Sequence, residues 1–244
     1  MSTTPVTEGR PPRVERVKSG AGSNEARTEG PTLDQKLTTE FLGTFVLAFT
    51  VGMATSKSGA GILAPLAIGS ALMVMVFAGA HISGAHYNPA VSIAIMLRGN
   101  ADRRQTLAYI ATQLTSGAVA GLLVRGLVGP AHPALLAAGW KIFTLELLFT
   151  FVLAYVVLSV ATVRATEGNS FFGLAIGFTL ATGVFAVGNL SGGAFNPAVA
   201  LGGSLGGSLL WSNLWIYLVA DCLGGVAAAV VFRYLDQGSR AAAT

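Results

Sequence analysis

Long apolar runs separated by short polar segments dominate the chain after residue 35. Six of them are near twenty residues long, at about 37–56, 62–82, 103–126, 141–163, 171–188 and 212–234. None alternates apolar and polar residues as a half-buried strand does. A run of about 20 apolar residues can cross a bilayer as an α-helix. The pattern therefore predicts an all-α polytopic membrane protein with six transmembrane helices.

Two shorter apolar runs, at about 88–98 and 196–207, each open on an Asn-Pro-Ala triplet. Asparagine is a favoured N-cap, and proline suits the first helical position because its missing N–H costs nothing there. Both runs are too short to cross a bilayer. They predict two re-entrant half-helices that begin at Asn88-Pro89-Ala90 and Asn196-Pro197-Ala198. The alternative is two capped helices in a soluble α/β protein.

Composition argues against the soluble alternative. Hydrophobic residues make up 52% of the chain, charged residues only 11%, and the mean hydropathy is +0.64. The 31 glycines suit membrane helices that pack closely without a hydrophobic force between them. The single cysteine, Cys222, excludes an internal disulfide and a cysteine-based metal site. We expect no metal, no cofactor and no nucleic-acid partner.

The two halves of the chain repeat one another. Residues 38–48 match residues 144–154 at eight of eleven positions, and the triplets match at an offset of 108. Residues 109–125 match residues 217–233 at the same offset. Three spans in each half require the second half to be inserted upside down, and such repeats place the functional site at the membrane midplane. The expected divisions are a disordered cytoplasmic tail (1–35), a first repeat (36–126), an extracellular loop (127–140), a second repeat (141–236) and a short C-terminal tail (237–244).

The basic residues set the expected orientation. With six spans, twelve of the 15 lysines and arginines fall on the side of the termini, and omitting the five before Lys36 leaves seven against three. Because cytoplasmic loops carry the excess of positive charge, both termini are expected in the cytoplasm, in a plasma or inner membrane. The basic tail can touch anionic lipid or be simply solvated.

The geometry of two facing half-helices suggests a mechanism. Each N-terminus carries about half a positive charge from the helix dipole, which repels cations and protons but not neutral solutes. The oxygens of Asn88 and Asn196 can cap backbone donors while their amide N–H groups face the passage.

These features together resemble the aquaporin, or major intrinsic protein, family. The resemblance rests on two NPA triplets, on residues 81–91 (HISGAHYNPAV), on residues 39–45 (TEFLGTF) and on six spans with two half-spans. It implies a passive pore in each subunit of a homotetramer in the lipid bilayer, for water and small neutral solutes such as glycerol, urea or undissociated metalloid acids. It implies neither an enzyme nor a cofactor.

Four further polar residues match family positions. Glu40 and Glu146 resemble buried glutamates that brace the re-entrant loops by accepting backbone N–H bonds; the alternative for Glu40 is snorkelling to the interface. His81 and His86 resemble residues that shape the cytoplasmic vestibule. A histidine can act as a proton switch or make a structural hydrogen bond.

The constriction departs from the family. Most members follow the second triplet with arginine, where this chain has Val199. The other three constriction positions fall on Ile68, Val184 and Gly193. This departure from the family predicts a wide, aliphatic opening without a fixed charge.

Asp221 is an acid in the middle of the last span, where the repeat has Gln113. Asp221 is either a buried carboxyl whose hydrogen bonds are satisfied within the protein or a functional group. The alternative function is an ion- or proton-coupled secondary transporter that uses Asp221. The sequence does not decide between water and larger solutes.

Overall fold

The computed structural model describes residues 30–129 and 137–241, and all their regular structure is helical. The α-helices are α1 (Leu33–Ala54), α2 (Ala64–Ser83), α3 (Pro89–Arg98), α4 (Arg103–Val128), α5 (Gly139–Ala161), α6 (Phe172–Ser191), α7 (Pro197–Gly206) and α8 (Leu214–Ala241). Short 3₁₀ turns occupy Gly61–Leu63, Arg164–Thr166 and Trp211–Asn213. Within the described residues, six helices are long and apolar enough to cross a membrane. The predicted all-α architecture with six spans is confirmed.

Local hydrogen bonds decide where two of the helices begin. Helix α1 begins at Leu33, inside the segment assigned to the tail, because Thr32 and Gln35 form a capping box. Helix α6 begins at Phe172, and its N-cap residue, Phe171, makes no side-chain cap bond. The Asn169 side chain donates from Nδ2 to the carbonyls of Val160, at the end of α5, and of Thr166, and its Oδ1 accepts from the Phe171 backbone N–H. The tail before residue 30 lies outside the described residues.

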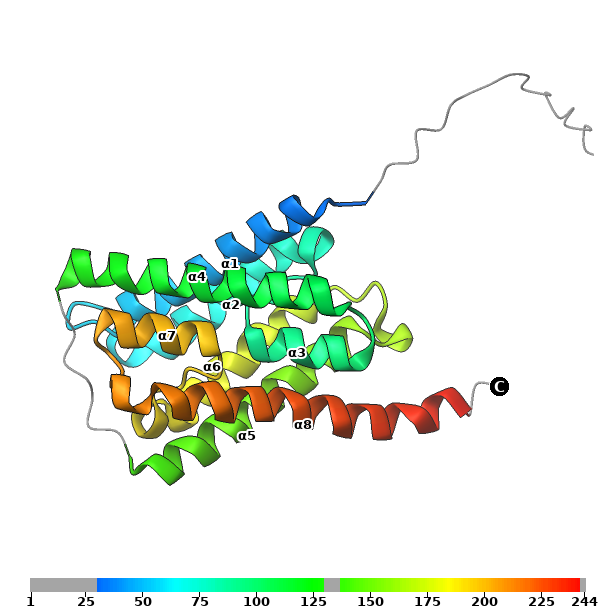
Figure 1. Cartoon of the computed structure of the whole chain (residues 1–244). Helices are drawn as coiled ribbons and strands as arrows, with labels where there is room; N and C mark the ends of the chain where they lie inside the picture. The colour runs from blue at the N-terminus through cyan, green and yellow to red at the C-terminus, as the bar shows by residue number, and fades with distance from the viewer. Residues whose placement is uncertain (1–29, 130–136, 242–244) are drawn as a thin grey trace, which may run out of the picture. The chain divides into compact units, whose positions relative to one another are not determined.

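The half-helices pack mainly against the opposite repeat. Helix α3 lies along α8, and α7 lies along α4, while α1 pairs with α4 and α5 pairs with α8. Figure 1 shows α3 and α7 nearly end to end between α4 and α8. The α3–α4 loop and the α7–α8 loop lie at opposite ends, so the N-termini of the two half-helices point toward the centre.

Two glycines permit this close packing. A Cβ atom at Gly117 of α4 would clash with the carbonyl oxygen of Ala198 at the start of α7. A Cβ atom at Gly225 of α8 would clash with the carbonyl oxygen of Ala90 at the start of α3. Because the repeat relates these contacts, each spanning helix holds the first turn of a half-helix from the other repeat against its own backbone.

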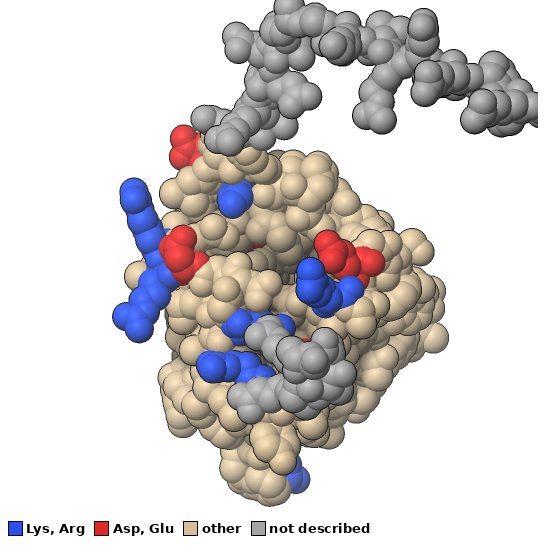
Figure 2. Space-filling model, turned by 90° about the vertical axis from the view of Figure 1, so that its right-hand side faces the viewer, with Lys and Arg blue, Asp and Glu red and all other residues tan. Residues whose placement is uncertain are grey.

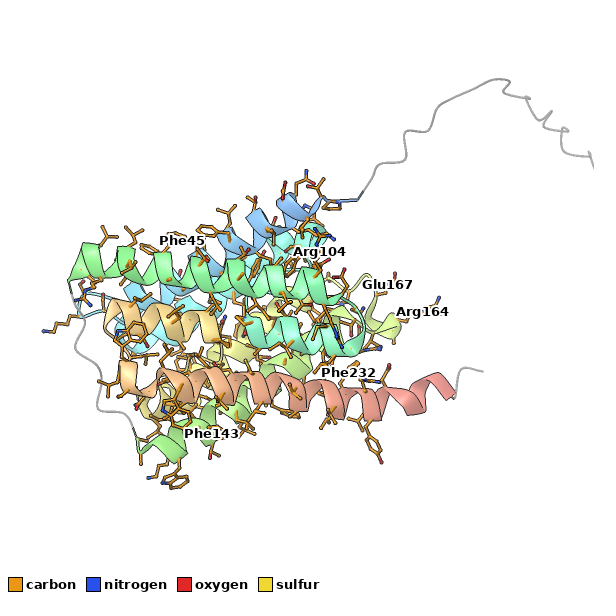
Figure 3. All side chains as sticks on the ribbon, in the orientation of Figure 1. Phe45, Arg104, Phe143, Arg164, Glu167 and Phe232 are labelled. Atoms are coloured by element: carbon orange, nitrogen blue, oxygen red, sulfur yellow. The ribbon has the colours of Figure 1, made fainter. Side chains whose placement is uncertain are left out.

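Charged side chains gather at the end of the helices where α1 begins. Figure 2 looks onto this end, where lysines, arginines and acids surround a central hollow. Arg104, Arg164 and Glu167 lie at this same end of the molecule in Figure 3. Arg98, at the end of α3, forms an ion pair of 2.9 Å with Asp236 of α8 and lies over the ring of Phe232. The end of the first half-helix is thereby fastened to the last helix of the chain.

Candidate functional site

At the centre of the molecule, the asparagine of each triplet is hydrogen-bonded to the backbone of the opposite loop. The Oδ1 of Asn88 accepts from the Ala90 backbone N–H at 2.9 Å, and the Oδ1 of Asn196 accepts from that of Ala198 at 2.9 Å. The Nδ2 of Asn88 donates to the Phe195 carbonyl at 2.8 Å. The Nδ2 of Asn196 donates to the Tyr87 carbonyl at 2.9 Å. Each side chain therefore caps its own half-helix and ties it to the opposite loop.

The residue before each asparagine has an unusual backbone. Tyr87 has a φ of 51° and Phe195 a φ of 46°, in the left-handed region that residues with a side chain rarely adopt. Such a conformation costs about 1–3 kcal/mol and persists only where the surroundings impose it. Here it turns the carbonyl of each residue toward the asparagine of the opposite loop.

Glu40 supplies the surroundings that hold the first loop. Its Oε1 accepts from Ser83 Oγ at 2.7 Å and from the His86 backbone N–H at 2.9 Å. Its Oε2 accepts from the Tyr87 backbone N–H at 2.7 Å and from Gln113 Nε2 at 2.8 Å. The side chain is fully buried, so the snorkelling alternative for Glu40 is wrong.

Glu146 occupies the same place in the second repeat. Its Oε1 accepts from the Ala194 backbone N–H at 3.2 Å, and its Oε2 from that of Phe195 at 2.7 Å. It is also fully buried. Both glutamates therefore accept backbone N–H bonds from the loops.

A narrow cavity lies beside the asparagines. Its lining comes from α1, α2, α5 and α6, from the two loops and from the first turns of α3 and α7. Three lining side chains are polar, namely Asn88, Asn196 and His86, and the others are apolar or glycine. No aspartate, glutamate, lysine or arginine of the described residues is among them. The cavity is thus an apolar passage with a short polar stretch at the triplets.

Comparison with known proteins identifies the family. The model of the family "Major intrinsic protein" matches residues 29–232. The chain belongs to this family. Its relatives include aquaporin NIP1-1 of Zea mays, 35% identical over 212 residues, which cover 82% of this chain and 74% of the relative. Another is the glycerol uptake facilitator protein-like 6 of Lactiplantibacillus plantarum, 37% identical over 217 residues, 83% of this chain and 99% of the relative.

The fold of this major intrinsic protein is also that of a solved structure. The aquaglyceroporin of Plasmodium falciparum superposes with a TM-score of 0.67 at 24% identity, over 82% of this chain and 96% of the other. Together with the six apolar helices, family membership shows an integral membrane protein. It is a passive channel for water and small solutes and not an enzyme.

The expected constriction residues are only partly gathered at the cavity of the channel. Ile68, Gly193 and Val199 line it, but Val184 is not among its lining residues. Val184 lies next to Gly193, since a Cβ atom at Gly193 would be 3.4 Å from its Cγ2.

The two histidines of the first loop occupy different surroundings. His86 is buried, lines the cavity and places its Nδ1 3.0 Å from Ser92 Oγ, with its ring edge-on to Tyr109. His81 lies in the last turn of α2 and is exposed. The structural hydrogen bond considered for these histidines is thus present at His86.

Several polar residues of the site were not predicted. Tyr109 donates its hydroxyl to the Ser83 carbonyl, and Tyr217 donates to the Ser191 carbonyl. Both the tyrosines and the serines are related by the offset of 108. Polar identity between the repeats was therefore the signal that could have found them. Gln113, which bonds Glu40 and Ser92, carries no such signal because its counterpart is Asp221.

Proposed function

We propose that the cavity is the conducting pore of the channel, centred on the two triplets. The supporting observation is its lining: both repeats contribute to it, and its only polar side chains are two asparagines and His86. Each asparagine amide has two N–H groups, of which one bonds the opposite loop. The other can donate to a passing water or hydroxyl oxygen. A solute is thus offered hydrogen bonds at the centre and apolar contact elsewhere.

Exclusion of cations follows from the same arrangement. The N-termini of α3 and α7 meet at the asparagines, and each carries about half a positive charge. The lining residues include no carboxylate that would offset this field. Cations and protons therefore meet a central barrier, while uncharged solutes pass.

The proposed constriction consists of Ile68, Gly193 and Val199, with Val184 next to Gly193. It offers no charge and no side-chain donor, so it favours solutes with a carbon skeleton or little hydration. We infer that water, glycerol, urea and undissociated metalloid acids are the solute class. The relative named as a glycerol uptake facilitator-like protein, matched over 99% of its length, supports the inclusion of glycerol.

We also propose an orientation in the membrane, a vestibule and an oligomeric state for the channel. The charged end with Arg104 and Arg164 supports a cytoplasmic location of both termini, in a plasma or inner membrane. His86, and His81 by its exposed place at the end of α2, would shape the vestibule on this side. We also propose two channel repeats, the first beginning with α1 and the second with α5, and, by resemblance to the family, a homotetramer in the bilayer.

A pair of substitutions on one helix tests the pore. Ile68 and Leu66 both belong to α2, but Ile68 is 2% exposed and lines the cavity, whereas Leu66 is 43% exposed. Ile68→Trp is expected to lower glycerol permeability at least about tenfold, which corresponds to about 1.4 kcal/mol of added barrier. Leu66→Trp, its matched control, should leave the rate unchanged. The measurement is stopped-flow light scattering on vesicles reconstituted with equal amounts of folded protein.

Two outcomes of this comparison would contradict the pore assignment. Equal rates for Ile68→Trp and the wild type would mean that solutes do not pass this cavity. An equal loss in both variants would point to a general effect of tryptophan on α2.

A further inference from the structure

Asp221 breaks the symmetry between the two loop supports. In the first repeat the Gln113 amide donates to Glu40 Oε2 at 2.8 Å. In the second repeat the corresponding position of α8 is Asp221, whose Oδ1 accepts from Thr150, one turn after Glu146 on α5. An amide donor beside one glutamate is thus replaced by an acid beside the other.

The surroundings of Asp221 leave one of its oxygens without a donor. Oδ1 accepts from Thr150 Oγ1 at 3.1 Å. Oδ2 is buried and has no hydrogen-bond partner among the described residues, although the Asn196 backbone N–H lies near this carboxyl. Asp221 is fully buried, and its partner Thr150 lies one turn from Glu146 on α5. Glu146 already uses both oxygens to accept from the backbone of Ala194 and Phe195.

Two ionised carboxylates cannot remain in contact at this depth. Like charges in contact repel, and a carboxylate in the membrane interior is costly even alone. When two carboxyls share one proton, the repulsion becomes a hydrogen bond. Since both oxygens of Glu146 accept backbone N–H bonds, Asp221 is the better site for the proton.

We propose that Asp221 is a positioning residue that carries a proton and donates it in a hydrogen bond to Glu146. The protonated acid then does for the second loop what Gln113 does for the first. It keeps Glu146 oriented toward the backbone of Ala194 and Phe195, immediately before Asn196. The consequence for transport rests on the proposed pore, whereas the shared proton does not.

The location of Asp221 argues against a role in coupled transport. Neither Asp221 nor Glu146 is among the residues that line the cavity. A proton held between them has no direct contact with a passing solute. The pair therefore supports the loop of a passive channel.

Two substitutions of Asp221 separate these roles. Asp221→Asn keeps an acceptor for Thr150 and supplies an N–H donor for Glu146, so it reproduces the protonated acid. It is expected to fold and to conduct glycerol like the wild type. Asp221→Leu removes the proposed hydrogen bond to the Glu146 carboxylate. The folded yield is therefore expected to fall about tenfold. The control is Asp102→Asn, at the exposed N-cap of α4, where asparagine caps as well as aspartate.

Infrared spectroscopy of the reconstituted protein detects the proton directly. The wild type and Asp102→Asn should show the carbonyl band of a buried protonated carboxyl, and Asp221→Asn should lack it. A band that survives in Asp221→Asn would overturn the proposal, as would failure of Asp221→Asn to fold. If the band disappears as expected but no variant or wild type conducts glycerol, the proton assignment stands and the proposed pore fails.

Discussion

Replacing Val199 by arginine is expected to turn the channel toward water and against glycerol. Val199 lies one turn into α7 from Asn196, is 4% exposed and lines the cavity. A guanidinium at this point narrows the passage and offers donors to water. Glycerol permeability should fall at least about tenfold, as about 1.4 kcal/mol of extra barrier requires. Water permeability should fall less, so the water-to-glycerol ratio rises.

The matched control is Val199→Leu, which adds volume without charge or donors. Only a modest change in the ratio is expected from it. Both variants are compared with the wild type in vesicles, by stopped-flow swelling with water and glycerol gradients. A ratio that Val199→Arg leaves unchanged would mean that the constriction lies elsewhere and that Ile68, Gly193 and Val199 do not form it.

Removal of either loop-supporting glutamate is expected to prevent folding, with little effect on solute choice in any protein that does fold. Glu40→Ala strands four donors, and Glu146→Ala strands two backbone N–H groups. Each hydrogen bond to a charged group contributes about 1.5–3 kcal/mol. The strained φ of Tyr87 and Phe195 would no longer be imposed. Glu40→Ala should therefore be the more severe change.

The yield of monodisperse protein after detergent extraction measures this effect. Glu167→Ala makes the same change at an exposed residue in the turn before α6 and should leave the yield unchanged. Normal yield and normal permeability of Glu40→Ala would show that its four hydrogen bonds do not support the loop.

The sequence predicts the fold well because a bilayer simplifies the problem. Length and hydropathy mark the spans, and the Asn-Pro pairs mark the two half-helix starts, which lie at Pro89 and Pro197 as predicted. Helix starts near the interface were harder, because local partners decide them. Gln35 completes the cap of Thr32, and the Asn169 amide donates to the carbonyls of Val160, in α5, and Thr166.

The candidate site was predictable where both repeats carry the same polar residue. Glu40 and Glu146 are an example, and both accept backbone N–H bonds from the loops. Where the repeats differ, position alone was not enough. The hydrogen bond between Thr150 and Asp221 depends on how α5 packs against α8, and the contact of Val184 with Gly193 depends on how the second loop folds back on α6. Such facts belong to tertiary packing.

Neutral solutes are proposed to cross this channel passively. Swelling of reconstituted vesicles tests this passive transport most directly. Gradients of an impermeant osmolyte, glycerol, urea and potassium chloride would be applied to one preparation, with and without a protonophore. We expect fast movement of water, glycerol and urea, no added potassium permeability, and rates that the protonophore leaves unchanged. Passage of water alone, or glycerol uptake that stops when the proton gradient is collapsed, would contradict it.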